Sequence, residues 1–285
     1  MNRVAPPAWE RVDVQAAGTR IATFVAGNRA ADARTLLLLH GLGHWSEGAW
    51  GRLVPELDPA LRCLAFDLPG FGASARPEAA YDLDFFRAVV DGVAAAAGLQ
   101  RFALAGHSLG GLIAADYAGA FAERVTRLAL IAPAGFARTP RHLAYALAMT
   151  GGIARPLFAR RPSRAFVDRM MLRSVDDPDA LDANHLDEAY RLSQDPSVRR
   201  AFGSVYAGAF SAFARARLLH AQFARFSGPV FCAWGATDRF ITPAALREVV
   251  RVYPRARTLL LERTGHLAMV ERAPELGAAL RDFLH

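Results

Sequence analysis

The sequence contains no lysine, so arginine supplies all 34 of its positive side-chain charges. The formal net charge is +7 at pH 7, a balance that is compatible with an anionic partner. However, no basic run with interleaved aromatic residues and no recognised nucleic-acid-binding motif accompanies this charge. We therefore expect no nucleic-acid partner.

Long apolar runs are also missing. No stretch reaches the 18 or so uninterrupted apolar residues that a membrane-spanning helix requires. The first nine residues, MNRVAPPAW, lack the apolar core of a signal peptide. We therefore predict no membrane span, and cytoplasmic localisation is the default expectation.

Cysteine is scarce, with only Cys63 and Cys232 in the chain. Two cysteines do not make a disulfide framework, and neither has the spacing of a metal ligand. Each lies inside an apolar run, where cysteine usually behaves as a small hydrophobic residue. We interpret both as core residues.

What the chain does contain is a regular alternation of apolar runs with stretches of helical spacing. An antiparallel hairpin at a sheet edge is predicted over residues 9–16 and 20–26. Buried strands are predicted at 35–41, 62–67, 101–105, 125–131, 229–234 and 257–261, and helices at 47–57, 83–97 and 109–121. Such alternation is typical of βαβ units, so we predict an α/β protein with a mostly parallel eight-stranded sheet and helices on both faces.

One segment breaks this alternation. Residues 136–226 contain no convincing strand but several helical patches, at 142–149, 163–171, 182–193 and 205–213. An insertion of about ninety residues far exceeds the usual connection of about 2 to 6 residues. We therefore predict a helical cap at 136–226, inserted into a core domain formed by 1–135 and 227–285.

The sequence Gly106-His107-Ser108-Leu109-Gly110 lies between a predicted buried strand and a predicted helix. A strand, a sharp turn and a helix with glycines at both flanks of a serine form the nucleophile elbow of serine hydrolases. The turn strains the serine backbone, and the free N–H groups at the helix start face any negative charge that develops nearby. Ser108 is therefore the candidate nucleophile.

A serine hydroxyl needs a base, and the base needs a carboxylate to orient it. Asp238 follows the strand predicted at 229–234, and His266 follows the strand predicted at 257–261. The loops after parallel strands line one crevice, so Ser108, Asp238 and His266 are predicted to converge there. Asp67 also follows a strand and is a rival acid, but the Pro-Gly-Phe-Gly turn after it indicates a structural loop.

With these residues in place, the chain resembles the α/β-hydrolases, in particular their cap-bearing, serine esterase-like group. The matching motifs are His40-Gly41, Asp67 to Gly72, Gly106 to Gly111, and the loops of Asp238 and His266. The resemblance implies that the backbone N–H groups of Leu42 and Leu109 form an oxyanion hole. It also implies that the rings of His40 and His107 brace loops rather than act in catalysis.

The resemblance implies a substrate pocket between this edge of the sheet and the cap. Its predicted lining is His44, Trp45, Tyr145, Met149, Phe210 and Leu267. Residues 138–217 hold 13 arginines and 8 acidic residues, an excess of 13 − 8 = 5 positive charges. A basic cap attracts anionic substrates, although such charges are more often a solvated helix face. The expected partner is accordingly a small-molecule ester, either apolar or anionic.

The predicted function is hydrolysis of carboxylic esters through a Ser-His-Asp triad and an acyl-enzyme, as in carboxylesterases and lipases, with no metal or organic cofactor. The same triad also supports hydrolysis of carbon–carbon bonds in meta-cleavage products. Relatives with that activity carry a small Gly-Pro-containing stretch where this chain has Leu42-Gly43-His44-Trp45. A ligand-binding or accessory protein on the same fold is a third alternative.

Overall fold

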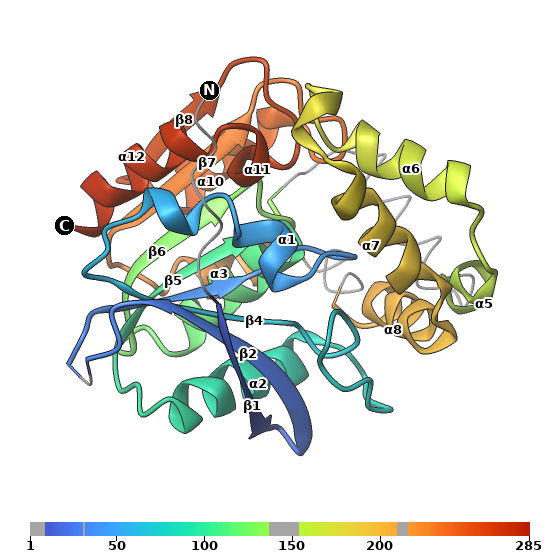
Figure 1. The fold of residues 1–285 in the computed structure, drawn as a ribbon. Helices are drawn as coiled ribbons and strands as arrows, with labels where there is room; N and C mark the ends of the chain where they lie inside the picture. Colours follow the sequence, from blue (N-terminus) through green and yellow to red (C-terminus); the bar gives the residue numbers. More distant parts are fainter. Residues whose placement is uncertain (1–8, 31, 137–153, 210–215) are drawn as a thin grey trace.

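A single twisted sheet of eight strands forms the centre of the molecule (Figure 1). The computed structural model describes residues 9–30, 32–136, 154–209 and 216–285. The strands are β1 (Glu10–Ala16), β2 (Thr19–Gly27), β3 (Thr35–Leu39), β4 (Arg62–Phe66), β5 (Phe102–His107), β6 (Val125–Ile131), β7 (Val230–Gly235) and β8 (Arg257–Leu261). Their order across the sheet is β1-β2-β4-β3-β5-β6-β7-β8.

The sheet is antiparallel at one edge and parallel over the rest. Strand β1 pairs with β2, and β2 with β4, in antiparallel register. From β4 to β8 every neighbouring pair is parallel. The carboxyl ends of six strands therefore share one edge, where ligands bind in open α/β sheets. The predicted fold class is confirmed.

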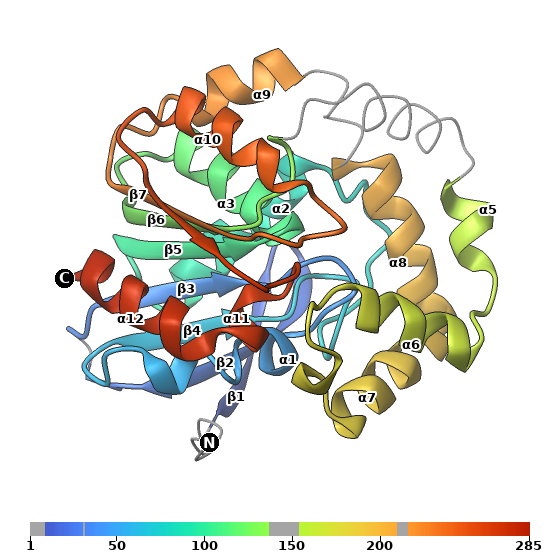
Figure 2. The same ribbon diagram turned by 90° about the horizontal axis from the view of Figure 1, so that it is seen from above.

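Helices cover both faces of the sheet (Figure 2). Alternate residues of β3 explain why: Leu37 and Leu39 join one buried cluster, while Leu36 and Leu38 join the other. The first cluster lies under α2 (Leu83–Ala96), α3 (Leu109–Ala120), α9 (Ala216–Phe223) and α10 (Leu246–Val252). The second lies under α1 (Ser46–Trp50), η1 (Val54–Glu56), α11 (Ala268–Glu271) and α12 (Ala273–Leu284).

Between β6 and α9 the chain forms a helical layer beside the sheet edge (Figure 1). It comprises α5 (Ala154–Ala159), α6 (Arg164–Arg173), η3 (Pro178–Ala180), α7 (Ala183–Gln194) and α8 (Pro196–Ala207). Side chains of Ser163, Asp182 and Asp195 cap the N-termini of α6, α7 and α8. The helices predicted at 163–171 and 182–193 are confirmed, and the division of the chain at 136 and 226 stays a prediction.

Two predicted helices have different bounds in the structure. The helix predicted at 47–57 is broken into α1 and η1, because α1 ends at Trp50 and a separate 3-10 turn with Pro55 in its first turn begins at Val54. The helix predicted at 205–213 overlaps the end of α8, which starts at Pro196 and ends at Ala207, and residues 210–213 lie outside the described residues. Asp195 and Pro196 supply the N-cap and the first turn. The patch predicted at 142–149 lies outside the described residues.

The scarce cysteines are both buried and free, as predicted. Cys63 lies in β4 and Cys232 in β7, with at most 2% of either residue exposed. Burial raises the pKa of the Cys63 thiol to about 12, which keeps it protonated and unreactive.

Within the described part of the chain, no helix has the length and apolarity needed to cross a membrane.

Candidate active site

Ser108 occupies the sharp turn between β5 and α3. Its φ of 52° and ψ of −114° lie in a region that residues with a side chain rarely adopt. The Ser108 N–H donates to Ile131 O at 3.0 Å, and its carbonyl accepts from Leu112 N and Ala134 N. A Cβ at Gly106 would collide with the backbone of Gly110, so the turn requires glycine there. The elbow thus holds the hydroxyl at the carboxyl edge of the sheet.

Asp238 and His266 meet at the same edge from the loops after β7 and β8. The Nδ1 atom of His266 lies 2.7 Å from Oδ2 of Asp238. The other carboxylate oxygen of Asp238 accepts from the N–H groups of Phe240 and Ile241, at 2.8 and 3.0 Å. The Asp238 side chain exposes no surface, and that of His266 exposes 10%. Asp238 is therefore fixed on both oxygens.

This pairing sets the tautomer of His266. A carboxylate only accepts hydrogen bonds, so Nδ1 carries the proton that it donates to Asp238. In the neutral ring, Nε2 is then unprotonated and able to accept a proton from a hydroxyl. An imidazolium that forms by this transfer lies beside the carboxylate of Asp238, which stabilises it.

His107 places the His266 loop beside the elbow. Its Nε2 donates to the carbonyl of His266 at 3.0 Å, and the two ring centroids are 4.6 Å apart. Burial is the main reason that the pKa of His107 lies well below its usual range, so the ring is neutral. Within the described residues, no hydrogen bond joins the Ser108 hydroxyl to His266, whose ring nitrogen Nδ1 is bonded to Asp238; a bond between nucleophile and base often tightens only when substrate binds.

His40 braces the loops after β3 and β4. Its Nε2 accepts from the N–H of Leu68 at 2.9 Å, so Nδ1 must donate to Gly41 O at 2.7 Å. The ring is fully buried and burial lowers its pKa. The expectation that His40 and His107 brace loops is confirmed by these backbone contacts.

The loop expected to supply an oxyanion-hole donor lies directly against Ser108. A Cβ placed at Gly41 would be 2.7 Å from His107 Nδ1 and 3.1 Å from the Cβ of Ser108. Leu42 follows Gly41 in this loop, and Leu109 is the first residue of α3. Both predicted donors therefore belong to backbone segments that flank the nucleophile.

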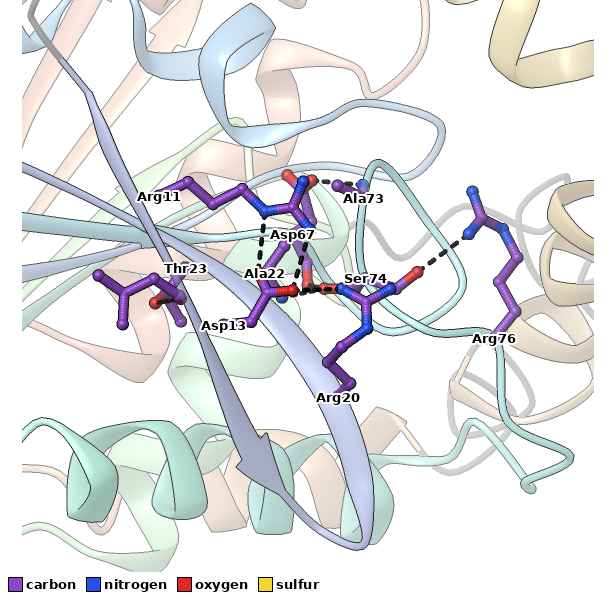
Figure 3. A network of polar contacts seen from close by, with 10 residues as sticks. Arg11, Asp13, Arg20, Ala22, Thr23, Asp67, Ala73, Ser74 and Arg76 are labelled. Carbon is purple, nitrogen blue, oxygen red and sulfur yellow. Dashed lines mark hydrogen bonds and ion pairs between the residues drawn. The ribbon is translucent and has the colours of Figure 1, made fainter.

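Asp67, the rival acid, holds the loops around it through hydrogen bonds (Figure 3). Its two carboxylate oxygens accept from Ser46 N and Ala73 N, each at 2.7 Å. Its carbonyl accepts from the hydroxyl of Ser74, which in turn accepts from Ala22 N. All of these partners are backbone N–H groups or the hydroxyl of Ser74, and none is a histidine. This agrees with the interpretation that the turn after Asp67 is a structural loop.

The predicted pocket residues fall into three groups. His44 and Trp45 are stacked, with ring centroids 5.9 Å apart. The side chain of Leu267 is fully buried in the cluster beneath α11 and α12, so it exposes no surface to a pocket. Tyr145, Met149 and Phe210 lie outside the described residues.

His185 of α7 also contacts this site and was not singled out in the sequence. Its ring lies 4.8 Å from that of Trp45 and 5.7 Å from that of His44. Burial lowers the pKa of His185 to about 4 and that of His44 well below its usual range. Each has one buried ring nitrogen with no hydrogen bond among the described residues. A lone histidine in a helical patch carries no signal that would place it here.

Comparison with known proteins agrees with this geometry. A family model of the alpha/beta hydrolase fold matches residues 34–273. The 2-hydroxymuconate semialdehyde hydrolase of Pseudomonas sp. strain CF600 is 30% identical over 261 residues, which cover 87% of this chain and 86% of that protein. A solved membrane phospholipase A, described as a novel bacterial virulence factor, superposes with a TM-score of 0.74 and 30% identity, covering 97% of this chain and 86% of that one.

A longer relative matches nearly the whole chain. The dihydrolipoyllysine-residue acetyltransferase component of the acetoin cleaving system of Cupriavidus necator is 26% identical over 280 residues, or 98% of this chain and 70% of that protein. The chain spans 63% of the length of the Pseudomonas putida protein of the same name. The family match, the sheet order and the strained serine elbow agree: the chain belongs to the alpha/beta hydrolase fold family.

Proposed function

We propose that this protein is a serine hydrolase that cleaves carboxylic esters, with Ser108 as nucleophile, His266 as base and Asp238 as the acid that orients it. The observation that carries the proposal is the 2.7 Å hydrogen bond between Asp238 and His266, on the same sheet edge as a serine whose backbone is strained. A strained backbone conformation of this kind persists only where the surrounding contacts hold it, and such residues cluster at active sites, as at nucleophile elbows.

In the first half of the reaction, Ser108 Oγ attacks the ester carbonyl carbon while its proton passes to Nε2 of His266. The carbonyl oxygen becomes an oxyanion, which the N–H groups of Leu42 and Leu109 stabilise. Each such donor contributes about a hundred- to thousandfold in rate. The tetrahedral intermediate then collapses, the C–O bond to the alcohol breaks, and His266 returns the proton to the departing alkoxide.

The second half releases the acid. Water attacks the acyl carbon of the Ser108 ester, His266 takes a proton from that water, and the second intermediate expels Ser108 Oγ, which regains the proton. The Asp238 carboxylate stays ionised throughout and stabilises the imidazolium each time that it forms.

Carbon–carbon bond hydrolysis is the second candidate, favoured by the 30% identity to 2-hydroxymuconate semialdehyde hydrolase over most of both chains. The same three residues serve such a reaction, in which the leaving group is a carbon rather than an alkoxide. Against it stands the bulky His44-Trp45 pair in the loop after β3, at the position where such hydrolases are expected to carry small residues.

The test is initial hydrolysis of p-nitrophenyl esters from acetate to dodecanoate, beside a ring-fission substrate of the 2-hydroxymuconate semialdehyde type. The enzymes are the wild type, Ser108→Ala and the control Ser204→Ala, whose serine lies on α8 in the cap layer. We expect ester turnover by the wild type and the control, and its near-complete loss in Ser108→Ala. Turnover of the ring-fission substrate alone would instead select the second candidate, and inertness toward both would reject the hydrolase proposal.

A further inference from the structure

Hydrogen bonds join the loop of His266 to a chain segment between α6 and α7, far away in the sequence. The carbonyl of Ser174 accepts from the N–H groups of His266 and Leu267, at 2.7 and 3.2 Å. Figure 2 shows this stretch beside α11. The backbone of the candidate base is thus held directly by a residue of the helical layer.

Glu271, the last residue of α11, joins the same two segments through its side chain. One carboxylate oxygen accepts from the N–H groups of Asp176 and Asp177, at 2.7 and 3.1 Å. The other oxygen accepts from the N–H of Gly265 at 2.7 Å. A single carboxylate therefore bridges the residue before His266 and a segment that lies 95 positions away.

The close approach of the two segments depends on Gly265. A Cβ at that position would lie 2.7 Å from the carbonyl oxygen of Ser174 and 2.8 Å from the backbone of Val175. Distances this short would force the backbone of one segment to move. With glycine there, the His266 loop and the segment Ser174–Asp177 stay within hydrogen-bond reach of each other and of Glu271.

We propose that Glu271 is a positioning residue that, together with the carbonyl of Ser174, fixes the backbone of His266 so that its ring faces Ser108. The inference rests on the proposed role of His266 as the base for Ser108. Glu271 does not touch substrate in this scheme. It acts through Gly265, and it makes the position of the base depend on the helical layer.

The geometry favours this role because the hydrogen bonds of Glu271 reach the loop of His266 itself. Glu271 is partly buried, and its three backbone partners lie on two segments far apart in sequence. Removing the carboxylate would leave these N–H groups without their acceptor, so it costs stability as well as position. The two effects are separable, because only a change of position alters the reactivity of Ser108 in the folded protein.

The experiment compares Glu271→Ala and Glu271→Gln with the wild type and with the control Glu275→Gln. Glu275 is an exposed carboxylate in the first turn of α12, four positions further on. The first readout is the rate at which a fluorophosphonate labels Ser108, a reaction that needs the base but no ester substrate. The second is the kcat and KM of ester hydrolysis. The third is the low-field proton NMR signal of the His266–Asp238 hydrogen bond.

In Glu271→Ala we expect the fluorophosphonate to label Ser108 about a hundredfold more slowly than in the wild type, and kcat for ester hydrolysis to fall by the same factor. A misplacement of about 1 Å produces a loss of this size. The KM should change little, and the low-field proton should shift and exchange faster. Glu271→Gln keeps one acceptor oxygen but turns an amide N–H toward a backbone N–H, so it should show the same changes at smaller size. The control should behave as the wild type does.

Labelling at the wild-type rate by folded Glu271 variants would overturn the inference. Should Glu271→Ala fail to fold, Glu271→Gln decides. The two proposals fail separately: a wild type that is labelled at Ser108 but hydrolyses no ester refutes ester hydrolysis, while the labelling rates of the variants still decide the role of Glu271. A wild type that is not labelled at all refutes both.

Discussion

At the scale of single residues, two buried aspartates at strand ends serve different purposes. Asp67 follows β4 and Asp238 follows β7, and both side chains accept backbone N–H groups. The difference lies in the remaining partner. One carboxylate oxygen of Asp238 accepts a hydrogen bond from the ring of His266. Both carboxylate oxygens of Asp67 accept from backbone N–H groups instead. Their substitution should therefore separate chemistry from stability.

Asp238→Asn should abolish most activity without unfolding the protein. The amide oxygen still accepts from Phe240 N and Ile241 N, which turns the amide NH2 toward His266. The ring must then accept at Nδ1 and carry its proton on Nε2, the wrong tautomer for a base. We expect kcat to fall by about 10⁴-fold, as for the same change in other triads. Unchanged kcat in the folded variant would contradict the assignment.

Asp67→Asn should show the opposite pattern. One amide N–H would face either Ser46 N or Ala73 N, leaving a buried donor without an acceptor. The expected cost is about 1–3 kcal/mol in the free energy of unfolding. Denaturant titration measures this loss, and kcat of the folded variant should stay near that of the wild type. A large loss of kcat at full stability would reopen Asp67 as the acid.

At the scale of elements, α8 packs on two loops at the candidate active site. Gly70 has a φ of +93°, and a Cβ there would lie 2.6 Å from the Cβ of Ala201 on α8. Gly43 has a φ of +76°, and a Cβ there would lie 2.7 Å from Cζ of Phe202. Two glycines with positive φ thus allow one helix of the helical layer to contact both loops closely.

Phe202→Ala should enlarge the site next to the loop of Leu42. The Phe202 ring packs edge-on against Phe71, 5.4 Å between centroids, and contacts Phe158 at 5.5 Å. Since the residue is partly exposed, the loss of stability should be smaller than the roughly 3–5 kcal/mol of a fully buried Phe→Ala change.

Hydrolysis of the p-nitrophenyl ester series checks the effect of Phe202→Ala. The acyl chain length that is hydrolysed fastest should be longer for this variant than for the wild type. Phe166→Ala serves as the control, because this phenylalanine of α6 is 54% exposed. An unchanged chain-length optimum would show that Phe202 supports α8 without bounding the substrate.

The elements were largely predictable because each strand or helix depends on local pattern. Apolar runs such as that of β3 predict buried strands, and the glycines around Ser108 predict the elbow. The start of α8 was also readable, since Asp195-Pro196 is a capping pair. The contacts of His185 and Glu271 were not, because each depends on segments far apart in sequence meeting in space. No local pattern encodes such a meeting.

At the scale of the whole molecule, several histidines are held neutral by burial. The pKa of His40 is lowered, those of His44 and His107 are lowered well below the usual range, and that of His185 is lowered to about 4. In the unfolded chain these rings titrate near the usual histidine pKa of 6.5. Below that pH the unfolded state binds more protons, so the folded state loses stability as pH falls.

The pH prediction concerns His185, whose pKa is 6.5 in the unfolded chain and about 4 in the folded protein. Because its folded pKa is lowered, its contribution to stability is complete above pH 6.5 and is lost as pH falls toward 4. His185→Gln removes one such site, so the slope of unfolding free energy against pH should decrease by at most about 1.4 kcal/mol per pH unit. Guanidinium titrations at several pH values measure it, and equal slopes would contradict burial of a neutral His185.

The path of the chain between β6 and β7 bears on how this protein can be re-engineered. Helix α9 packs against α3 and α10 and leads into β7, so β6, α9 and β7 already form an ordinary crossover unit of the sheet. The helical layer interrupts that unit without supplying any of its strands. A cap grafted from another hydrolase would therefore leave the sheet intact. To keep His266 in place, however, the graft would need to present a carbonyl where Ser174 now lies and two N–H groups to Glu271.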